Sequence, residues 1–532
     1  MENDFFYGID SMTPGIALGI ETGAVSGRLD SRAREKVDAC YRAVAGIVEK
    51  KKIVYGINTG FGSLCTTIIS KEETQKLQTN ILRSHSVGVG DHVPEHITRL
   101  MLILKVHALS RGFSGIAVTT LERMLWHIEN RVTPVVPCKG SVGASGDLAP
   151  LAHLFLPLIG QGFVRYKGRI VETAQMFQQE GLEQVRLGPK EGLALINGTQ
   201  FMTAFGVTAL ERMNLSLDSA DIISAMTLEA LLGSAKPFIP ELHQLRPYAG
   251  QQHVAHRMQV MLHGSEMVAS HADCGRVQDP YSLRCIPQVH GACRNAWLHL
   301  HDIFSVEVNA VTDNPVVFNE NTTVSGGNFH GEPIAIPMDY ASIAASELGN
   351  ISDRRTYLML KGGYGGLPVL LMQHTGINSG FMIPQYTSAA LVSENKSLCF
   401  PASCDSIPTS LGQEDHVSMG SISSRKLNTI LDNLENILAV ELVCAAQAFD
   451  FRRPMKSGPV LEACHNLVRS RIDHAEEDRI FSRDLADARD IIVSGNLRQV
   501  SESAAAKAGV DLQGEHADLF SMGVYSSTLM QD

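Results

Sequence analysis

The sequence has no cluster of lysine or arginine and no long apolar run. Lys and Arg together number 45 against 56 Asp and Glu, so the formal net charge is −11. Nucleic acids and anionic membranes bind basic surfaces, and we therefore expect neither as a partner. The longest apolar run near the most unusual motif is LAHLFLPLIG, residues 151–160. It is much shorter than the ~20 residues that a membrane-spanning helix needs.

Paired cysteines and a leader sequence are also missing. The ten cysteines are scattered and none is spaced C-x-x-C, which argues against a zinc ribbon or a disulfide scaffold and favours free thiols. The first residues, MENDFFYGIDSMTPG, contain no basic stretch followed by an apolar one, so we expect no secretory signal. The pairs His253/His256 and His299/His301 lack cysteine or acidic partners at metal-binding spacing, and we expect them on helix surfaces. The sequence thus predicts a cytoplasmic protein without a bound metal.

What the chain does have is length and the composition of a well-buried globular protein. Its 532 residues are 44% hydrophobic and 19% charged, and they exceed what one ordinary core holds. Residues 1–200 contain glycine-rich loops between helices, and a small hairpin is predicted at 162–172. Residues 201–532 change to long helices, followed by a tail without regular pattern after about 505. We predict a mainly α protein with a glycine-rich N-terminal domain at 1–200 and a long helix bundle at 201–532.

The clearest long helix is predicted at 421–453. Its apolar residues at 427, 430, 431, 434, 437 and 438 are spaced by three and four, so they share one helical face. A single helix of this length would span roughly 50 Å and would end before Pro454. The segments 204–234, 290–311 and 336–361 have similar patterns. Several such helices predict a bundle whose facing side chains can build a site.

The most unusual segment is GSVGASGDLAP, residues 140–150. A nucleophile elbow is excluded, because Asp147 stands where the last glycine of G-x-S-x-G should be. A phosphate-binding loop is excluded, because no lysine follows Gly146. One interpretation that remains is a plain turn, since glycine and serine are common in turns. The other is self-modification: the Gly146 nitrogen attacks the Ala144 carbonyl and closes a five-membered ring, and loss of the Ser145 hydroxyl leaves an exposed alkene.

The same segment, with others in order along residues 55–419, resembles the aromatic amino-acid ammonia-lyases and related aminomutases. The resemblance implies that Ala144, Ser145 and Gly146 form 4-methylidene-imidazol-5-one (MIO), an electrophile, with no external cofactor. It implies that Asp147 assists this step, by moving protons or holding the loop. It also implies a homotetramer whose active sites take residues from more than one subunit. The motifs that carry it are GSVGASGDLAPLAH, YGINTGFG, NILRSHSVGVG, EGLALINGTQ, VQDPYSLRCIPQVHGA, TDNPVV, SGGNFHGEP, SENK and QEDHVSM.

The resemblance assigns roles at the reacting centre. Tyr55 would be the base that removes the β-proton of the substrate, although an ordinary tyrosine titrates only near pH ~10. Asn197 would stabilise negative charge on the MIO ring carbonyl. Tyr281 would assist the handling of the amine or the formation of MIO. Phe329 would pack beside the ring.

Further residues would bind the substrate. Arg284 would hold its carboxylate in a bidentate fork, and Gln278 would hydrogen-bond the carboxylate or the amine. In family members that act on phenylalanine or tyrosine, the position of Ser84-His85 is typically Phe-Leu or His-Leu. The pair Ser-His resembles the members that act on histidine, since His85 can bond an imidazole. Glu414 would pair with a protonated imidazole or with the α-amine.

Three hypotheses for function follow. The first is deamination of L-histidine to trans-urocanate and ammonia. The second is a tyrosine ammonia-lyase or a MIO-dependent tyrosine aminomutase, because Tyr386 stands where a smaller aliphatic residue is expected. The third is a catalytically inactive helical bundle that acts in binding or assembly and forms no MIO.

Overall fold

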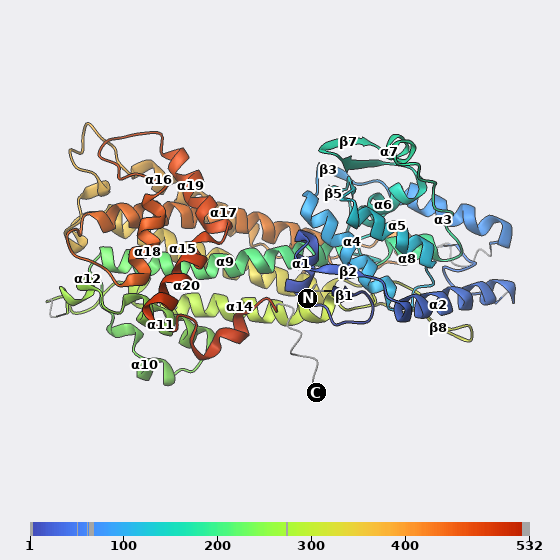
Figure 1. Ribbon diagram of the computed structural model, residues 1–532, viewed down its shortest axis with the longest axis horizontal. Coiled ribbons are helices and arrows are strands. Elements are labelled where there is room, and N and C mark those ends of the chain that lie inside the picture. Colours follow the sequence, from blue (N-terminus) through green and yellow to red (C-terminus); the bar gives the residue numbers. More distant parts are fainter. Residues whose placement is uncertain (1–3, 51, 61, 63–68, 273–274, 524–532) are drawn as a thin grey trace.

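The protein is mainly helical, as the sequence predicts. It is seen here as a computed structural model that describes residues 4–50, 52–60, 62, 69–272 and 275–523. A long bundle extends from a lobe of shorter helices and small strand pairs (Figure 1). The glycine-rich motifs lie in the lobe, and the long helices connect it to the opposite end of the molecule.

Four long helices form the bundle, and each confirms a helix expected from the sequence. Their starts and ends differ from the predicted ones by a few residues, and the last helix ends before Pro454. Helix α9 is buried on nearly every side, because the other three surround it, so its apolar residues are not confined to one stripe. The four are α9 (Gln200–Ala230), α14 (Ile286–Glu307), α15 (Glu332–Leu360) and α17 (Gly420–Asp450).

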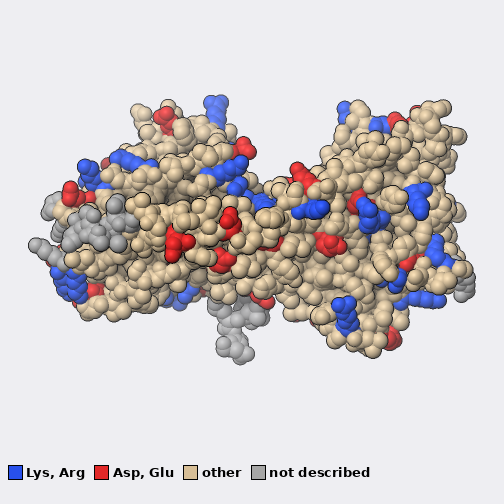
Figure 2. Space-filling view, turned by 180° about the vertical axis from the view of Figure 1, so that it is seen from behind, with Lys and Arg blue, Asp and Glu red and all other residues tan. Residues whose placement is uncertain are grey.

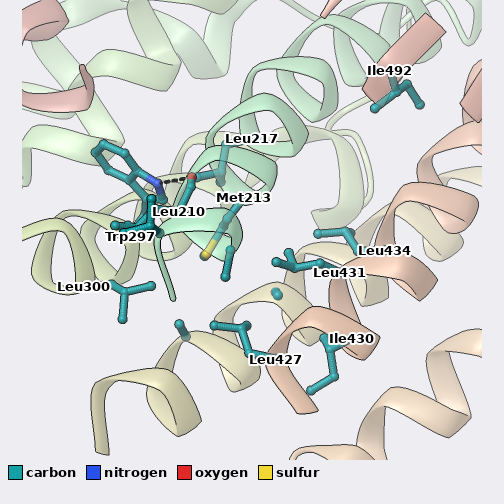
Figure 3. Close-up of a cluster of buried hydrophobic side chains, with 14 of the residues drawn as sticks. Leu210, Met213, Leu217, Trp297, Leu300, Leu427, Ile430, Leu431, Leu434 and Ile492 are labelled. Atoms are coloured by element: carbon teal, nitrogen blue, oxygen red, sulfur yellow. Dashed lines mark hydrogen bonds between the residues drawn. The ribbon is translucent and has the colours of Figure 1, made fainter. Parts of the chain in front are cut away.

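The apolar core of the bundle lies where α9, α14 and α17 meet α19 (Phe481–Val493). All six apolar positions predicted for one face of α17 are buried. Trp297 fills the centre, and its indole nitrogen donates to the Leu210 carbonyl oxygen at 2.8 Å. Figure 3 shows this cluster, with Leu210, Met213, Leu217, Trp297, Leu300, Leu427, Ile430, Leu431, Leu434 and Ile492 labelled.

Several of the charged groups that are buried in the bundle form ion pairs. Arg355 of α15 contacts Glu441 of α17 at 2.6 Å, and both side chains are fully buried. Asp221 of α9 accepts from Arg257 at 2.9 Å and from Arg294. Pairing of this kind offsets the cost of removing charges from water.

The lobe is built from short helices and two- or three-stranded sheets. The predicted hairpin at 162–172 is confirmed as the antiparallel pair β6 (Phe163–Tyr166) and β7 (Arg169–Glu172), and β4 (Thr133–Pro134) extends it. The other pairs are β1 (Asp4–Phe6) with β2 (Ser26–Arg28), β3 (Val89–His92) with β5 (Pro137–Lys139), and β8 (Val316–Asn319) with β9 (Thr322–Val324). The helices are α1 (Pro14–Thr22), α2 (Ser31–Glu49), α3 (Lys71–His85), α4 (Glu95–Ser110), α5 (Val118–Glu129), α6 (Leu148–Phe155), α7 (Thr173–Glu180) and α8 (Glu191–Ile196).

The change from short to long helices falls at Gln200, where α9 begins. Helices α4 and α6 of the first part pack against α9 of the second. The division into domains at 1–200 and 201–532 stays a prediction.

The tail after 505 is more regular than expected. Helix α20 (Asn496–Ala508) ends at Gly509, whose φ of +69° suits a left-handed helix end, and a 3-10 helix, η7 (Gly514–Phe520), follows. Phe520 is buried beside His253 and Trp297. His253 is therefore in the core, and its expected place on a helix surface is wrong. The remaining helices are α10 (Pro240–Gln244), α11 (Ala249–Leu262), α12 (Glu266–Ala269), α13 (Tyr281–Arg284), α16 (Met382–Leu398) and α18 (Pro459–Arg469).

The state of the cysteines and the distribution of surface charge agree with what the composition predicts. The eight cysteines within the described ranges are all unpaired. On the face drawn in Figure 2, Lys and Arg are interspersed with Asp and Glu. Among the helices that the structure describes, none is both long enough and apolar enough to cross a membrane.

Candidate active site

The glycine-rich loop 140–147 connects β5 to α6 and is folded tightly. Gly143 and Gly146 have φ angles of +70° and +74°, a region that favours glycine. A Cβ atom at Gly146 would lie 2.1 Å from the Gly198 carbonyl oxygen. Any side chain at 146 would therefore push the two segments apart. This close approach is the reason why the third residue of Ala-Ser-Gly is glycine.

A second loop, which precedes α9, lies against the first. Gly146 and Gly198 form an isolated bridge, and the Asp147 amide donates to the Gly198 carbonyl oxygen at 2.7 Å. The Asn197 side-chain nitrogen donates to the Ser145 carbonyl oxygen at 2.6 Å. Asn197 thus places a hydrogen-bond donor on the carbonyl that self-cyclisation would leave in the ring.

Asp147 connects the glycine-rich loop to helix α9 of the bundle by a hydrogen bond. Its carboxylate is fully buried and accepts from the Met202 amide at 3.0 Å, in the first turn of α9. An acidic group is favourable there, because the first amides of a helix lack partners within it. Burial nevertheless raises the pKa of Asp147 to about 7, against the opposing effect of the amide hydrogen bonds.

Lys105 is a residue that the sequence analysis did not select. Its ammonium group is buried beneath Asn197 and donates to the Asn197 carbonyl oxygen at 2.6 Å and to Gln200 Oε1 at 3.3 Å. Burial lowers the pKa of Lys105 to about 7. The signal was a single lysine inside the apolar stretch ITRLMLILKVHALS, where a charged side chain is unusual.

Glu414 lies on the other side of Ser145. The Ser145 hydroxyl donates to Glu414 Oε1 at 2.8 Å, and the Thr409 hydroxyl donates to Oε2 at 2.9 Å. The segment 409–419 that carries Glu414 is attached to the glycine-rich loop, since the Met419 amide donates to the Val142 carbonyl oxygen at 3.0 Å. Ser145 is consequently held between an amide donor and a carboxylate acceptor.

Ser145, Asn197 and Glu414 line a cavity of about 1020 Å³. The cavity has ample room for a small aromatic amino acid, and its walls are partly polar and partly apolar. The Gly62 amide donates to the Tyr55 hydroxyl at 3.2 Å. Seven of the residues selected from the sequence line the cavity: Tyr55, His85, Ala144, Ser145, Asn197, Phe329 and Glu414.

His85 ends α3 and faces the same cavity. Its Nδ1 lies 2.9 Å from the Ser84 hydroxyl oxygen. Burial lowers the pKa of His85, while the Ile81 backbone and the Glu414 carboxylate act in the opposite direction. A neutral imidazole at this place can both donate and accept a hydrogen bond.

Three selected residues lie elsewhere in the chain. Gln278, Tyr281 and Arg284 follow α12, at the end of the bundle opposite the lobe, and none is among the described residues that line the cavity (Figure 1). The guanidinium of Arg284 lies 4.5 Å from the ring centroid of Tyr281, whose side chain is 71% exposed. Tyr386, on α16, is also exposed and outside this cavity.

Comparison with known proteins assigns the chain to a family. A family model described as aromatic amino acid lyase matches residues 16–470. The chain is 45% identical to the histidine ammonia-lyase of Gloeobacter violaceus, over 92% of this chain and 96% of that protein. The crystal structure of histidine ammonia-lyase from Trypanosoma cruzi covers 99% of both chains with a TM-score of 0.89 and 37% identity. The tyrosine aminomutase of Streptomyces globisporus covers 95% of this chain and 99% of its own, with a TM-score of 0.88 and 34% identity. On the evidence of its motifs, its fold and these matches, the chain belongs to the aromatic amino acid lyase family.

Proposed function

We propose that this protein removes ammonia from L-histidine and releases trans-urocanate, as a carbon–nitrogen lyase of histidine degradation. The observation that carries the proposal is the setting of Ser145, between Asn197 and Glu414 in a cavity that His85 also lines. Relatives named histidine ammonia-lyase that are 44% and 47% identical over 89% of this chain support the same substrate.

We also propose that Ala144, Ser145 and Gly146 form MIO without an external cofactor. The Gly146 nitrogen bonds to the Ala144 carbonyl carbon, and the carbonyl oxygen leaves as water with the hydrogens of the Gly146 and Ser145 nitrogens. A double bond then joins the Ala144 carbon to the Ser145 nitrogen. The Ser145 hydroxyl then leaves with the α-hydrogen as a second water, which creates the alkene. When present, the group supplies an electrophilic carbon that can bond to the substrate amine.

The residues around the loop fit this group. The Ser145 carbonyl oxygen, which accepts from Asn197, remains a carbonyl oxygen in the ring. The contact with Gly198 requires a residue without a side chain at 146 and so keeps the attacking nitrogen unhindered. Asp147 holds the loop against α9 through the Met202 amide.

The other cavity residues would bind the substrate and move its protons. Tyr55 would take the β-proton. His85, kept neutral by burial, would hydrogen-bond the imidazole of the substrate. Glu414 would pair with the protonated imidazole or with the amine, within reach of Ser145. Phe329 would pack against the ring on the cavity wall.

Gln278, Tyr281 and Arg284 would reach the cavity of a neighbouring subunit. Their distance from the cavity of their own chain and the exposure of Tyr281 support this arrangement. We propose a homotetramer with shared active sites, in which Arg284 holds the substrate carboxylate in a bidentate fork. We place the enzyme in the cytoplasm, where the unpaired cysteines of the described ranges would remain reduced.

A second candidate is a tyrosine ammonia-lyase or a tyrosine aminomutase, because one structural relative is named a tyrosine aminomutase. Tyr386, which first suggested it, is not in the cavity of its own chain. Incubation of the enzyme with L-histidine and, separately, with L-tyrosine distinguishes the candidates. We expect urocanate from histidine and negligible turnover of tyrosine. A β-amino acid product, or turnover of tyrosine alone, would contradict the first proposal.

A further inference from the structure

A buried lysine lies beside Asn197 and is bound to neutral groups. Lys105 of α4 is 1% exposed. Among the residues that the structure describes, its hydrogen-bond acceptors are the Asn197 carbonyl oxygen at 2.6 Å and Gln200 Oε1 at 3.3 Å. Lys190 is also fully buried, but it pairs with the Asp313 carboxylate at 2.6 Å. A cation that is buried without a hydrogen-bonded partner of opposite charge is costly, so stability does not explain Lys105.

The position of the Asn197 side chain depends on the backbone of the same residue. The side-chain nitrogen donates to the Ser145 carbonyl oxygen at 2.6 Å. The side-chain oxygen is buried and has no hydrogen-bond partner within the described part of the chain. The Asn197 amide donates to the Leu193 carbonyl oxygen of α8 at 3.0 Å, and Lys105 binds the Asn197 carbonyl oxygen. Helix α8 and Lys105 thus hold the two ends of the residue that contacts Ser145.

Lys105 also holds the turn that follows Asn197. Gly198 has a φ of +135°, a region that favours glycine, and the chain enters α9 at Gln200. The Gln200 side chain accepts from Lys105 through Oε1 and donates to the Thr312 hydroxyl oxygen at 2.9 Å through Nε2. One ammonium group therefore binds both ends of the turn. Its loss would release the Asn197 carbonyl oxygen, and a shift of ~1 Å near a reacting centre can lower the rate about 10²-fold.

We propose that Lys105 is a positioning residue of the lyase reaction, which fixes Asn197 so that its side-chain nitrogen stays on the Ser145 carbonyl oxygen. This inference rests on the proposed function, in which negative charge would develop on that oxygen. A donor that is in place before the charge develops stabilises it without rearrangement. Lys105 is not among the described residues that line the cavity, so it acts through Asn197 and not on the substrate.

Crystal structures test the contact without reference to activity. The full-length variants Ser145→Ala and Ser145→Ala/Lys105→Met both lack the serine that the proposed chemistry needs, so failure of the lyase proposal does not affect their comparison. We expect the Asn197 side-chain nitrogen to remain hydrogen-bonded to the carbonyl oxygen of residue 145 in the first variant. In the second, the two atoms should lie more than ~3.5 Å apart. An unchanged contact would overturn the role of Lys105.

If Lys105→Met does not fold, Lys105→Gln takes its place in every comparison. The glutamine side chain is one bond shorter than that of lysine, so its nitrogen would not reach the Asn197 carbonyl oxygen. The expected results are the same for both variants.

Kinetics in the otherwise wild-type enzyme distinguish positioning from a general loss of packing. Lys105→Met should lower kcat for histidine ~10-fold or more and change KM less than ~2-fold, because Asn197 acts on charge that develops after the substrate has bound. Lys105→Arg keeps a cation with several donors and should restore most of kcat. The peptide that contains residues 140–150 should have the same mass in all three proteins. A wild-type kcat in Lys105→Met, or a loss that appears only in KM, would contradict the proposal.

Two further variants test whether Lys105 acts through Asn197. Adding Lys105→Met to Asn197→Ala should lower kcat less than ~2-fold, because the residue that Lys105 positions is already truncated. The matched control Lys190→Met leaves the Asp313 carboxylate unpaired, so it should lower the melting temperature more than Lys105→Met does and kcat less. Additive losses in the double variant, or an equal fall of kcat in Lys190→Met, would show that Lys105 supports the fold and not Asn197. If the wild type forms no urocanate, the lyase proposal fails, and the crystal structures decide the role of Lys105.

Discussion

At the scale of single residues, the proposed choice of substrate rests on two polar side chains in the cavity wall. In the proposed reaction His85 would offer the substrate imidazole a hydrogen bond, and Glu414 lies close enough to interact with His85 electrostatically. The Ser145 hydroxyl donates a hydrogen bond to Glu414, so these two side chains lie next to the reacting centre. The proposed preference for histidine would therefore depend on polar groups that an apolar ring cannot satisfy.

His85→Leu should reduce kcat/KM for histidine by about 10²-fold or more, because a site built to bond a polar ring loses that bond. Steady-state urocanate formation measures the effect. The peptide that contains residues 140–150 should have the same mass as in the wild type, since His85 takes no part in ring closure. Full histidine activity in this variant would show that the substrate is recognised elsewhere.

The buried Asp147 carboxyl predicts a pH dependence of stability. Its pKa is about 7 in the folded protein and near ~4 in an unfolded chain, so the folded state binds the proton more tightly between these values. The stability that comes from this proton is fully present below pH ~4 and is lost as the pH rises through about 7.

We therefore expect the melting temperature of Ser145→Ala, relative to Ser145→Ala/Asp147→Asn, to fall between pH 4 and 7 and to level off above. The Ser145→Ala background keeps the loop uncyclised in both proteins, and melts are compared at one protein concentration. A difference in melting temperature that stays constant between pH 4 and 7 would contradict a raised pKa of Asp147 in the folded protein.

At the scale of elements, α15 and α17 are joined by a buried ion pair as well as by apolar packing. Arg355→Met should reduce the free energy of unfolding by about 3–5 kcal/mol, because it leaves Glu441 charged and without its partner in the core. The matched control is Lys50→Met, which breaks the exposed pair with Glu320 and should cost less than about 1 kcal/mol. Denaturant titrations at one protein concentration measure both. Equal losses of unfolding free energy in the two variants would show that burial does not increase the contribution of the ion pair.

Helix α17 could be predicted because the apolar periodicity of its segment is a local property of the sequence. The ends of the long helices were predicted less accurately, because contacts with distant parts of the chain fix some of them. The first turn of α9 is capped by Asp147, which lies 55 residues earlier in the chain. Similarly, η7 forms where Phe520 packs against Trp297, a contact that no pattern in the tail reveals.

At the scale of the whole molecule, the family motifs were sufficient to predict most of one cavity. They could not reveal Lys105, because its contact with Asn197 joins α4 to a loop far along the chain. Nor could they show that Tyr281 and Arg284 lie at the far end of the bundle from Ser145. That separation is a property of the folded chain, and the proposed sharing of active sites between subunits rests on it.

Shared active sites predict complementation between inactive subunits. Ser145→Ala and Arg284→Ala should each be nearly inactive, but co-expression should restore activity, because some mixed sites contain both wild-type residues. Co-expression of Ser145→Ala with Asn197→Ala should give no such gain, since Asn197 and Ser145 meet within one chain. Urocanate formation by the purified mixed oligomers measures the result. No gain in the first mixture over its parents would contradict sharing.

The central claim is that Ala144, Ser145 and Gly146 react with one another. The mass of the peptide containing residues 140–150, measured on freshly purified active enzyme, tests it most directly. Ring closure and formation of the alkene predict a mass lower by two water molecules, with the Ser145→Ala variant retaining its full unmodified mass. An unmodified peptide in active wild-type enzyme would contradict the account.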